Sequence, residues 1–297
     1  MHTDHSIVER FMFHGREFFV KRDDQIDPLL SGNKYRKLYT LVHTSADRYQ
    51  AIISYGGTQS NAMLSLAALC QRKGWQFHYT TKILPAHIKA APGGNLNIAL
   101  QLGMQLHEVS HADYQHAVDA LHSNSDAAQI VVPQGGADPM AQAGIEQLAH
   151  EIARWQHTEG IEQVQLVTPS GTGTTAFYLA QALPQSNVLS TACVGDKAYL
   201  IRQMSRLGTM PGNLHILETS KKYHFAKPYP ELLAIYHELK TAGIEFDLLY
   251  ACPMWHCLLQ HVENTNGTIL YIHSGGLMGN ATMLDRYKHK GLIPGVE

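Results

Sequence analysis

The chain has 297 residues, of which 44% are hydrophobic and 16% are charged, and its formal net charge is -2. This length suffices for one large domain or two moderate ones, and the near-neutral charge offers no basic surface to nucleic acid or to an anionic membrane. A small neutral or zwitterionic substrate fits the composition better.

The cysteines and the apolar runs indicate in which cellular compartment the protein is expected. The four cysteines have irregular spacing and no CxxC pair, which favours a reducing environment: Cys70, Cys193, Cys252 and Cys257. The first ten residues lack the apolar stretch of a signal peptide, and the longest apolar run, AMLSLAALC, is too short to cross a membrane. We therefore expect a cytoplasmic protein with no membrane partner.

Short β-branched and apolar runs alternate with longer helical patterns from residue 50 onward. The runs predict strands at 51–57, 76–81, 104–109, 129–136, 164–171, 187–195, 214–220, 246–253 and 268–276. The segments between them predict helices at 61–74, 95–103, 112–123, 139–160, 174–183, 197–208, 229–243, 254–266 and 280–291, several of which end on a glycine suited to a helix C-terminus. An α/β protein with largely parallel sheets is therefore predicted.

The ends of several predicted strands are rich in glycine and hydroxyl residues. The fullest of these loops joins the strand at 164–171 to the next helix through Gly171, Thr172, Gly173, Thr174 and Thr175. Backbone N–H groups, hydroxyls and the positive end of a helix would all face one anion there, and phosphate is the natural ligand. The structural alternative is an ordinary tight turn between strand and helix.

Two other motifs compete with this interpretation. Gly171, Gly173 and Ala176 also have the spacing of a relaxed dinucleotide fingerprint, with Asp196 after the next strand, so an NAD-dependent enzyme stays open as an alternative. Residues 107–111 match the HExxH zinc motif, which requires a helix. Because residues 104–109 alternate like a strand and Ser110 resembles the cap of a helix beginning at His111, we expect no metal site there.

Four motifs in a fixed order resemble those of a known family: KRDD with SGNKYRKL at 21–38, GGTQSNA at 56–62, the glycine and hydroxyl loop, and HSGG at 273–276. Together they resemble the pyridoxal-phosphate enzymes of the tryptophan synthase β fold type (fold type II). Within that family the sequence is most similar to the 1-aminocyclopropane-1-carboxylate deaminase and D-cysteine desulfhydrase group.

The resemblance covers residues 20–280 and implies an architecture. Residues 1–45 and 150–297 would build a larger cofactor domain, and residues 46–149 a smaller inserted α/β domain. It also implies a homodimer, and pyridoxal phosphate as the cofactor.

The resemblance implies that Lys34 forms the Schiff base with the cofactor. A lysine suits this role because its partly deprotonated amine is a nucleophile and, once freed, can move the Cα proton of the substrate. The structural alternative is a solvated basic turn formed by Lys34, Arg36 and Lys37.

The same resemblance implies a substrate site at the start of the helix expected at 61–74. Gln59, Ser60 and Asn61 would bind the substrate, with Ser60 also taking part in catalysis and Asn61 beside the ring oxygen of the cofactor. Helix capping is the structural alternative for Ser60 and Asn61. Relatives tend to have Gln or His where this chain has Ala62.

Two further residues are implied around the cofactor ring. Tyr250 matches a tyrosine placed beside the cofactor for stacking or acid-base catalysis, and Ser274 matches a hydroxyl that faces the ring nitrogen. The structural alternatives are a core tyrosine and a turn serine. Deaminases of the family have a glutamate where this chain has Ala251, and Gly-Lys is usual at the positions of Cys252 and Pro253.

A hydroxyl stabilises a protonated ring nitrogen less than a carboxylate does, so prompt loss of a β-leaving group is favoured. The sequence therefore predicts a lyase that releases a keto acid and ammonia from a small amino acid, most similar to D-cysteine desulfhydrase. The alternative within the family is 1-aminocyclopropane-1-carboxylate deaminase. A non-catalytic cofactor-binding protein also stays open.

Overall fold

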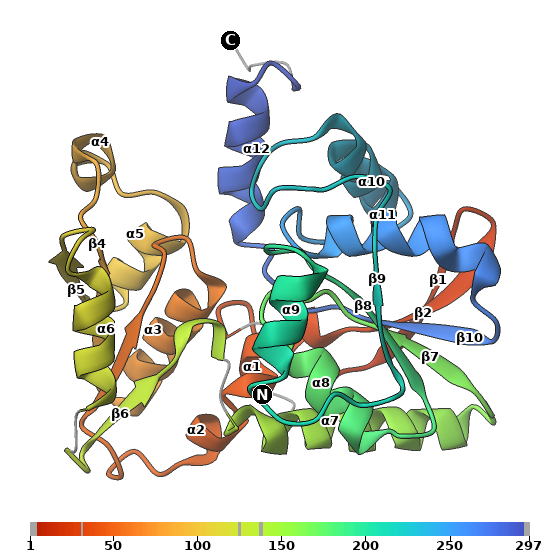
Figure 1. Cartoon of the computed structure of the whole chain (residues 1–297), viewed down its shortest axis with the longest axis horizontal. Helices are drawn as coiled ribbons and strands as arrows, with labels where there is room; N and C mark the ends of the chain where they lie inside the picture. Colours follow the sequence, from red (N-terminus) through yellow and green to blue (C-terminus); the bar gives the residue numbers. More distant parts are fainter. Residues whose placement is uncertain (1–4, 31, 124–125, 137–138, 294–297) are drawn as a thin grey trace.

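The computed structural model describes residues 5–30, 32–123, 126–136 and 139–293. Two sheets lie side by side in Figure 1, each with helices packed on it. Ala137 and Asp138, which follow the predicted strand at 129–136, lie outside the described residues. No helix in the described ranges is long and apolar enough to span a membrane.

The larger sheet has six strands and is parallel except for β1, which pairs antiparallel with β2. Its strands, in spatial order, are β1 Val8–Phe13, β2 Arg16–Lys21, β10 Thr268–Ile272, β7 Val164–Val167, β8 Asn187–Thr191 and β9 Leu214–Leu217. The smaller sheet has four parallel strands in the order β5 Met104–Val109, β4 Gln76–Lys82, β3 Ala51–Tyr55 and β6 Gln129–Val132.

The α-helices alternate with these strands over most of the chain. They are α1 Asn33–Lys37, α2 Tyr39–His43, α3 Asn61–Lys73, α4 Ala86–Ala90, α5 Gly94–Gln101, α6 Tyr114–His122, α7 Ala141–Thr158, α8 Thr174–Ala182, α9 Lys197–Met204, α10 Pro230–Thr241, α11 Ala251–His261 and α12 Gly279–His289. The prediction of an α/β protein with largely parallel sheets is confirmed.

The strands of the smaller sheet all lie between residues 51 and 132, and those of the larger sheet lie on both sides of this range. This order is compatible with an inserted unit. The domain limits at 45/46 and 149/150 stay a prediction.

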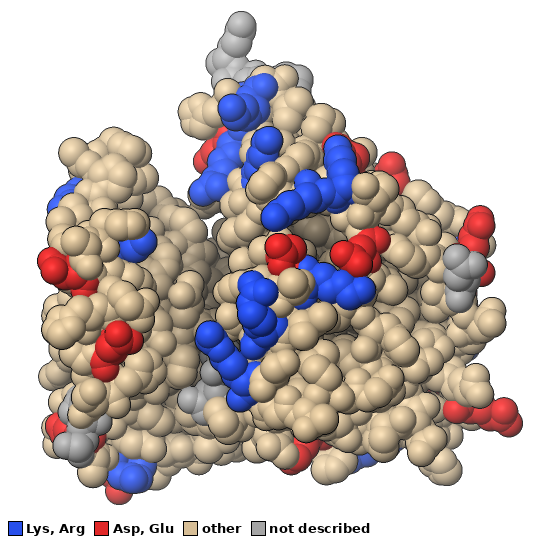
Figure 2. All heavy atoms as spheres, in the orientation of Figure 1, with Lys and Arg blue, Asp and Glu red and all other residues tan. Residues whose placement is uncertain are grey.

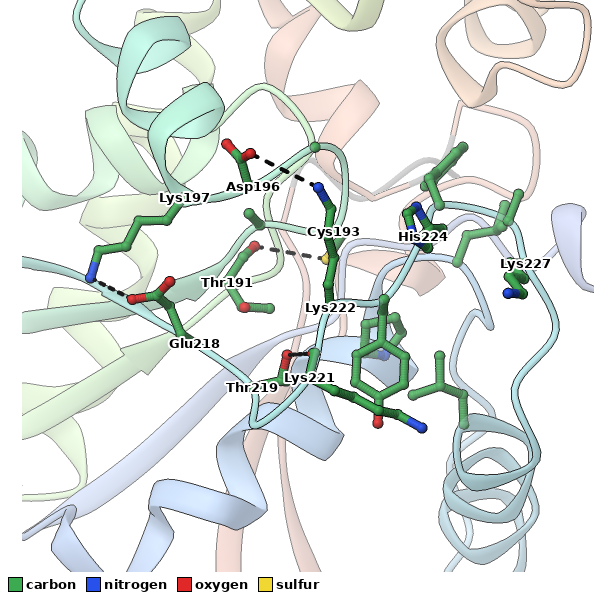
Figure 3. Close-up of a pocket in the computed structure, with 18 of the residues that line it drawn as sticks. Thr191, Cys193, Asp196, Lys197, Glu218, Thr219, Lys221, Lys222, His224 and Lys227 are labelled. Atoms are coloured by element: carbon green, nitrogen blue, oxygen red, sulfur yellow. Dashed lines mark hydrogen bonds and ion pairs between the residues drawn. The ribbon is translucent and has the colours of Figure 1, made fainter.

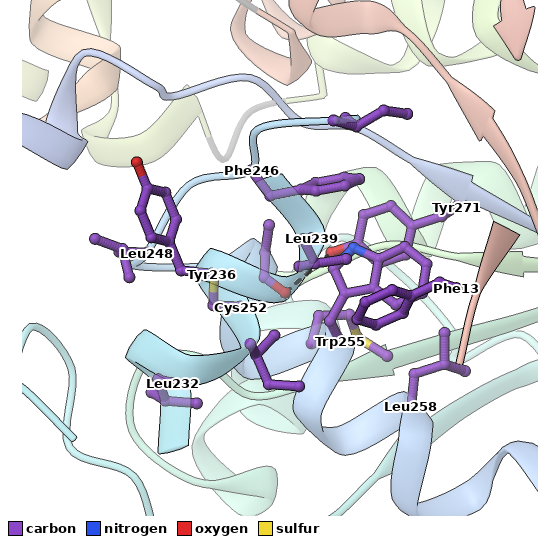
Figure 4. Close-up of a cluster of buried hydrophobic side chains, with 14 of the residues drawn as sticks. Phe13, Leu232, Tyr236, Leu239, Phe246, Leu248, Cys252, Trp255, Leu258 and Tyr271 are labelled. Carbon is purple, nitrogen blue, oxygen red and sulfur yellow. Dashed lines mark hydrogen bonds between the residues drawn. The ribbon is translucent and has the colours of Figure 1, made fainter. Parts of the chain in front are cut away.

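Side chains of the central strand β10 alternate between the two faces of the larger sheet. Ile269 and Tyr271 pack in one buried cluster with α10 and α11, whereas Leu270 and Ile272 pack in another with α7 and α8. Figure 4 shows the first cluster, in which the ring of Trp255 stacks on that of Tyr271 with 4.5 Å between centroids. Helices therefore cover both faces, as a parallel sheet requires.

The sequence analysis placed a strand at 246–253, and this prediction was wrong. Residues 248–250 form a turn, and α11 begins at Ala251 rather than at the predicted residue 254. Asp247 interrupts the apolar run, and its carboxylate accepts hydrogen bonds from the backbone N–H groups of Leu249, Tyr250 and Ala251 at 2.7–3.1 Å. The segment thus starts a helix through side-chain capping, which its apolar run of residues did not reveal.

Two further expectations for the chain were wrong or incomplete. The helix expected to begin at His111 begins at Tyr114, because the Ser110 hydroxyl accepts from the N–H of Asp113 and holds a turn first. The hairpin of β1 and β2 was not predicted. Its two-residue turn, His14 and Gly15, has positive φ at both positions, as a tight hairpin turn between twisted strands requires.

Helix α1 is held against the loop that follows β10. Gly32 has φ 54°, and a Cβ there would clash with the carbonyl oxygen of Ser274. The N–H of Asn33 donates to that same oxygen at 3.1 Å. On the other side, a Cβ on Gly144 of α7 would clash with the carbonyl oxygen of Arg36, so α7 approaches α1 closely. Two glycines therefore fix the position of the short helix that carries Lys34.

A buried ion cluster anchors the same helix. The Arg36 guanidinium, which is fully buried, donates to Asp23 at 2.8 and 2.9 Å and to Glu151 of α7 at 2.6 and 2.8 Å. Lys21 of β2 donates to Glu151 at 2.6 Å. Although burial alone raises the pKa of Glu151, its hydrogen bonds and charge contacts with Arg36 and Lys21 lower that pKa to about 2. The cluster ties α1 to the larger sheet and to α7.

Candidate active site

A cavity lies between the start of α3, which packs on the smaller sheet, and the strand ends of the larger sheet. Its lining is Asn33, Lys34, Lys37, Asn61, Gly135, Pro169, Gly171, Thr172, Asp247, Tyr250, Ser274 and Gly275. Six of these were singled out from the sequence: Lys34, Asn61, Gly171, Thr172, Tyr250 and Ser274. Segments far apart in the chain thus bring an amine, a phenol, hydroxyls and glycines to one place.

Lys34 projects into the cavity from the first turn of α1. Its Nζ donates to the side-chain oxygen of Asn33 at 3.0 Å. Burial lowers the pKa of Lys34 to about 8, against the opposing effect of the Asp247 carboxylate. About a tenth of the amine is therefore unprotonated at pH 7, far more than for an ordinary lysine, as nucleophilic chemistry needs.

Lys37 lies one turn after Lys34 and points toward the glycine and hydroxyl loop. Its Nζ lies 3.1 Å from the carbonyl oxygen of Gly135 and 3.4 Å from Oγ1 of Thr172. It has no carboxylate partner within the part of the chain that the structure describes. Burial, with a smaller contribution from Lys34, lowers its pKa well below the usual value. An anion bound at the loop would supply the missing countercharge.

The loop itself is shaped as an anion cradle. Gly173 has φ 80° and no room for a Cβ beside Met204, so the loop turns sharply into α8. The hydroxyl of Thr172 contacts that of Thr174 at 3.0 Å, and the buried Oγ1 of Thr175 has no hydrogen-bond partner. The N-terminal N–H groups of α8 add a positive partial charge here. Gly173, Thr174 and Thr175 do not line the cavity itself.

Tyr250 forms part of the cavity wall next to this loop. Its ring lies against Gly171, where a Cβ would sit 3.2 Å from Cε1 of the tyrosine. Burial, followed by the charges of Cys193 and Asp247, raises the pKa of Tyr250 well above its usual value. The phenol therefore keeps its proton and acts as a donor at neutral pH.

Asp247 places a carboxylate in the same cavity. Burial raises its pKa to about 6, although three backbone N–H groups and Lys34 favour the charged form. The residue holds the start of α11 and hence the position of Tyr250. Ala251 offers no carboxylate, but Asp247, four residues earlier in the chain, places one in the cavity.

Asn61, from α3, and Ser274, from the loop after β10, both line the cavity. The side-chain oxygen of Asn61 accepts from Asn95 at 3.0 Å, and its nitrogen lies so close to Gly276 that a Cβ there would be 2.8 Å away. The hydroxyl of Ser274 is buried and has no hydrogen-bond partner. A buried hydroxyl without a hydrogen-bond partner destabilises the fold unless a ligand supplies that partner.

Ser60 and Gln59 lie next to the cavity but do not line it. Ser60 caps α3, and its Oγ accepts from the N–H groups of Ala62 at 3.2 Å and Met63 at 3.3 Å. The Gln59 side chain donates to Gly93 at 3.0 Å and accepts from Asn95 at 3.1 Å, so it holds the start of α5. The capping interpretation of Ser60 therefore holds, and its predicted role in binding stays a prediction.

Two residues of the competing motifs have other partners. Asp196 caps α9 by accepting from the N–H of Tyr199 at 2.8 Å. His107 lies on strand β5 and contacts His78 at 3.1 Å. Among the described residues, no group of three or more His, Cys, Asp or Glu side chains is arranged to hold a metal ion.

The residues of the cavity fit pyridoxal phosphate. Lys34 offers an amine for its aldehyde, and Thr172, Lys37 and the start of α8 offer donors and positive charge for its phosphate. Ser274 offers an unpartnered buried hydroxyl to a ring heteroatom, and the face of Tyr250 offers a stacking surface. The fold and site thus define an α/β enzyme class that binds a phosphorylated aldehyde beside a lysine.

Comparison with known proteins agrees with this class. The model of the pyridoxal-phosphate dependent enzyme family matches residues 9–244, so the chain belongs to that family and its cofactor is pyridoxal phosphate. The chain is 25% identical to a putative 1-aminocyclopropane-1-carboxylate deaminase of Thermotoga maritima over 90% of each chain. It is 27% identical to a D-cysteine desulfhydrase of Yersinia enterocolitica over 88% of this chain and 87% of the relative.

The solved structures agree on the fold. A homologue of 1-aminocyclopropane-1-carboxylate deaminase superposes with a TM-score of 0.72 and 18% identity, covering 95% of this chain and 94% of the other. The predicted fold class, family resemblance and cofactor are therefore confirmed. The alternative of an NAD-dependent enzyme is rejected, because the family that matches uses pyridoxal phosphate.

Lys37 and Asp247 are functional candidates that the sequence analysis missed. Lys37 was considered only as part of a solvated turn, although its spacing of three from Lys34 places both on one side of a helix. Asp247 was read as part of a strand. Its spacing of three and four residues before Tyr250 and Ala251 is the signal of a helix cap that could have identified it.

The low pKa of Lys34 leads to a prediction for cofactor loading. When apoprotein is mixed with pyridoxal phosphate, the rate of covalent attachment should rise about tenfold per pH unit below pH 8 and level off above it, because only the unprotonated amine reacts. Stopped-flow absorbance between pH 6 and 9 would measure this. A rate that is flat over this range would contradict the assigned pKa.

Proposed function

We propose that the protein is a pyridoxal-phosphate-dependent lyase that eliminates a β-leaving group from a small amino acid and releases a keto acid and ammonia. The observation that carries this proposal is one cavity that Lys34, Tyr250 and the unpartnered Ser274 line together, with no carboxylate at Ala251. The names of the relatives, which include D-cysteine desulfhydrases, support the same chemistry.

Lys34 has two tasks under this proposal. Its unprotonated amine would bind the aldehyde of the cofactor, and the same amine, once free, would take the proton from the substrate Cα. When bound, pyridoxal phosphate supplies an electron-withdrawing ring that stabilises negative charge at that carbon. The lowered pKa of Lys34, about 8, suits both tasks near neutral pH.

Lys37 and Tyr250 have different tasks in the cavity. Lys37, which has no carboxylate partner among the residues described, would donate to the phosphate together with Thr172 and the first turn of α8, and the negative charge of the phosphate would raise the lowered pKa of Lys37. Tyr250 keeps its proton because burial raises its pKa, so it can donate that proton to a departing β-group. Asp247 keeps Tyr250 in place through the start of α11.

The start of α3 receives the substrate carboxylate. The Ser60 oxygen accepts two backbone N–H groups, and its hydroxyl is hydrogen-bonded to that of Tyr79, so it would have to turn from Tyr79 to donate to the carboxylate. Asn61, which lines the cavity, supplies an amide beside the cofactor ring. Because Ala62 follows them, this end of the site lacks the longer polar side chain of the relatives.

The ring nitrogen of the cofactor is assigned to Ser274. Its hydroxyl is buried and free of protein partners, whereas the Asp247 carboxylate already accepts three backbone hydrogen bonds. A neutral hydroxyl at the ring nitrogen makes the ring a weaker electron acceptor than a carboxylate would, which favours prompt loss of the β-leaving group. Elimination is therefore preferred to ring-opening deamination.

A substrate panel tests the proposal. The purified holoenzyme would be incubated with D- and L-cysteine, D- and L-serine, chloroalanine and 1-aminocyclopropane-1-carboxylate, and keto acid and ammonia would be measured, with Lys34→Ala as the control. We expect product from an amino acid with a β-leaving group, D-cysteine first. Product from the cyclopropane substrate alone would assign the deaminase reaction, and no product from any would favour a non-catalytic cofactor-binding protein.

We also propose that the protein is a cytoplasmic homodimer. Its ligands are small amino acids, and it has no nucleic-acid or membrane partner. All four cysteines are free and buried, which suits a reducing compartment. Sedimentation equilibrium of the holoenzyme tests the dimer, and a single species of 33.0 kDa would contradict it.

A further inference from the structure

A second cavity lies beyond the ends of β8 and β9 of the larger sheet, on the face shown in Figure 2. Its volume is about 320 Å³, compared with about 70 Å³ for the cavity lined by Lys34. Its walls are the start of α9, residues 218–229 and the start of α11 (Figure 3). None of the roles assigned above uses this space.

The rim of the second cavity carries an excess of positive charge. Four lysines line it against two carboxylates: Lys197, Lys221, Lys222 and Lys227 against Asp196 and Glu218. Lys221 also pairs with Glu231, which lies just outside the lining, so an excess of one positive charge remains here in a chain whose net charge is -2. Ligands of negative charge are therefore favoured at this site.

Not all of these lysines are neutralised by protein groups. Lys197 pairs with Glu218 at 3.1 Å, and Lys222 reaches Asp196 only at 4.0 Å (Figure 3). Lys227 contacts only the ring face of Tyr229, at 5.4 Å, and has no carboxylate partner in the ranges that the structure describes. Lys222 and Lys227 are thus the two cations most available to a ligand.

Apolar side chains also line this cavity. Leu232, Leu248, Leu249, Pro253 and Met283 contribute to its lining. A binding site of this kind suits a molecule with a charged end at the rim and a hydrophobic body inside. A free inorganic anion would use only the rim.

The wall formed by residues 218–229 is held in a defined shape although it has no regular secondary structure. Ala226 adopts φ 58°, which is rare for a residue other than glycine, and Arg286 donates to its carbonyl oxygen at 2.9 Å. The N–H of His224 donates to the Tyr229 hydroxyl at 3.1 Å. Strained backbone that neighbours hold in place is a feature of ligand sites.

We propose that this cavity is a second ligand site, which binds an organic carboxylate with a short apolar body. The carboxylate lies at the rim between Lys222 and Lys227, and the apolar body lies against Leu249 and Pro253. The start of α9 contributes a positive partial charge at the same rim.

The second site is in contact with the first. The ring of Phe225, in the wall of the second cavity, lies 5.4 Å from the ring of Tyr250, and the Cys193 thiol lies 3.5 Å from the carbonyl oxygen of Tyr250. A ligand that shifts Phe225 therefore acts on the wall of the cofactor cavity. Its binding should change the absorbance of the bound cofactor.

Calorimetric titration of the holoenzyme with benzoate tests the site, with benzamide as the uncharged analogue. We expect benzoate to bind with a Kd in the millimolar range or below, and benzamide at least tenfold more weakly. The double variant Lys222→Met/Lys227→Met should lose at least tenfold in benzoate affinity. Lys290→Met, an exposed lysine at the end of α12, is the matched control and should behave as wild type.

Ser60→Ala distinguishes the two cavities, because Ser60 is assigned to the carboxylate of the amino-acid substrate. An unchanged benzoate affinity in this variant is expected. Loss of affinity in Ser60→Ala, or equal affinity in wild type and in the double lysine variant, would overturn the proposal, as would no benzoate binding. Binding without any change in cofactor absorbance would retain the site and overturn its coupling to Tyr250.

Discussion

Lys34→Ala is expected to lower turnover on the preferred substrate by a factor on the order of 10³ or more, because one amine serves as both cofactor anchor and proton acceptor. The variant should still bind pyridoxal phosphate, since Thr172, Lys37 and the start of α8 are untouched. Steady-state kinetics and the absorbance of the bound cofactor, which should resemble that of the free aldehyde, would measure both effects.

Lys37→Met is the matched control for this experiment. It removes a lysine from the same short helix but leaves the reactive amine, so it should weaken cofactor affinity and retain turnover once cofactor is saturating. Lys34→Ala with wild-type turnover would refute the assigned role. An equal loss of turnover in both variants at saturating cofactor would show that disruption of α1, rather than removal of the Lys34 amine, causes the loss.

Arg36→Met is expected to destabilise the fold by about 3–5 kcal/mol, because it leaves the buried carboxylates of Asp23 and Glu151 without their main partner. Arg10→Met is the control. Arg10 lies on the surface at 3.8 Å from Glu17 and 3.9 Å from Glu159, so its loss should cost only about 0–1 kcal/mol. Urea unfolding at pH 7 gives both free energies of unfolding.

The same variant should change the response to acid. The pKa of Glu151 is lowered to about 2 in the folded protein, so its contribution to stability is present above its unfolded pKa, about 4.3, and is lost as the pH falls toward 2. Arg36→Met removes the main partner that lowers this pKa, and its free energy of unfolding should fall less steeply between pH 5 and 3 than that of wild type. Parallel curves would contradict the role of the cluster.

Much of the fold could be predicted because its strands and helices obey simple patterns. The buried strands β3, β7 and β10 are short apolar runs followed by glycine or hydroxyl residues, and the helices between them have a helical period. The strand predicted at 246–253 failed because Leu248 and Leu249 extend an apolar run, while the hydrogen bonds of Asp247 decide for a helix start.

The cavity could be predicted in part because the ends of parallel strands meet at one edge of a sheet. Gly171 and Ser274 follow this rule, whereas Lys34 joins them from α1 and Tyr250 from the start of α11. The burial of Lys37 could not be predicted, because the sequence does not reveal that Gly135 and Thr172 close over its amine.

The second cavity was not predicted either. Its lysines are spread over residues 197–227 and match no motif in the sequence. Only the folding of residues 218–229 over the strand ends gathers them on one face.

The most direct test of the central claim is borohydride reduction of the purified holoenzyme followed by peptide mapping. Reduction should abolish the visible absorbance band and fix the cofactor to a single peptide, with the added mass on Lys34. Cofactor attached to Lys37 or to any other lysine, or no covalent label at all, would contradict the assignment of Lys34 and the mechanism built on it.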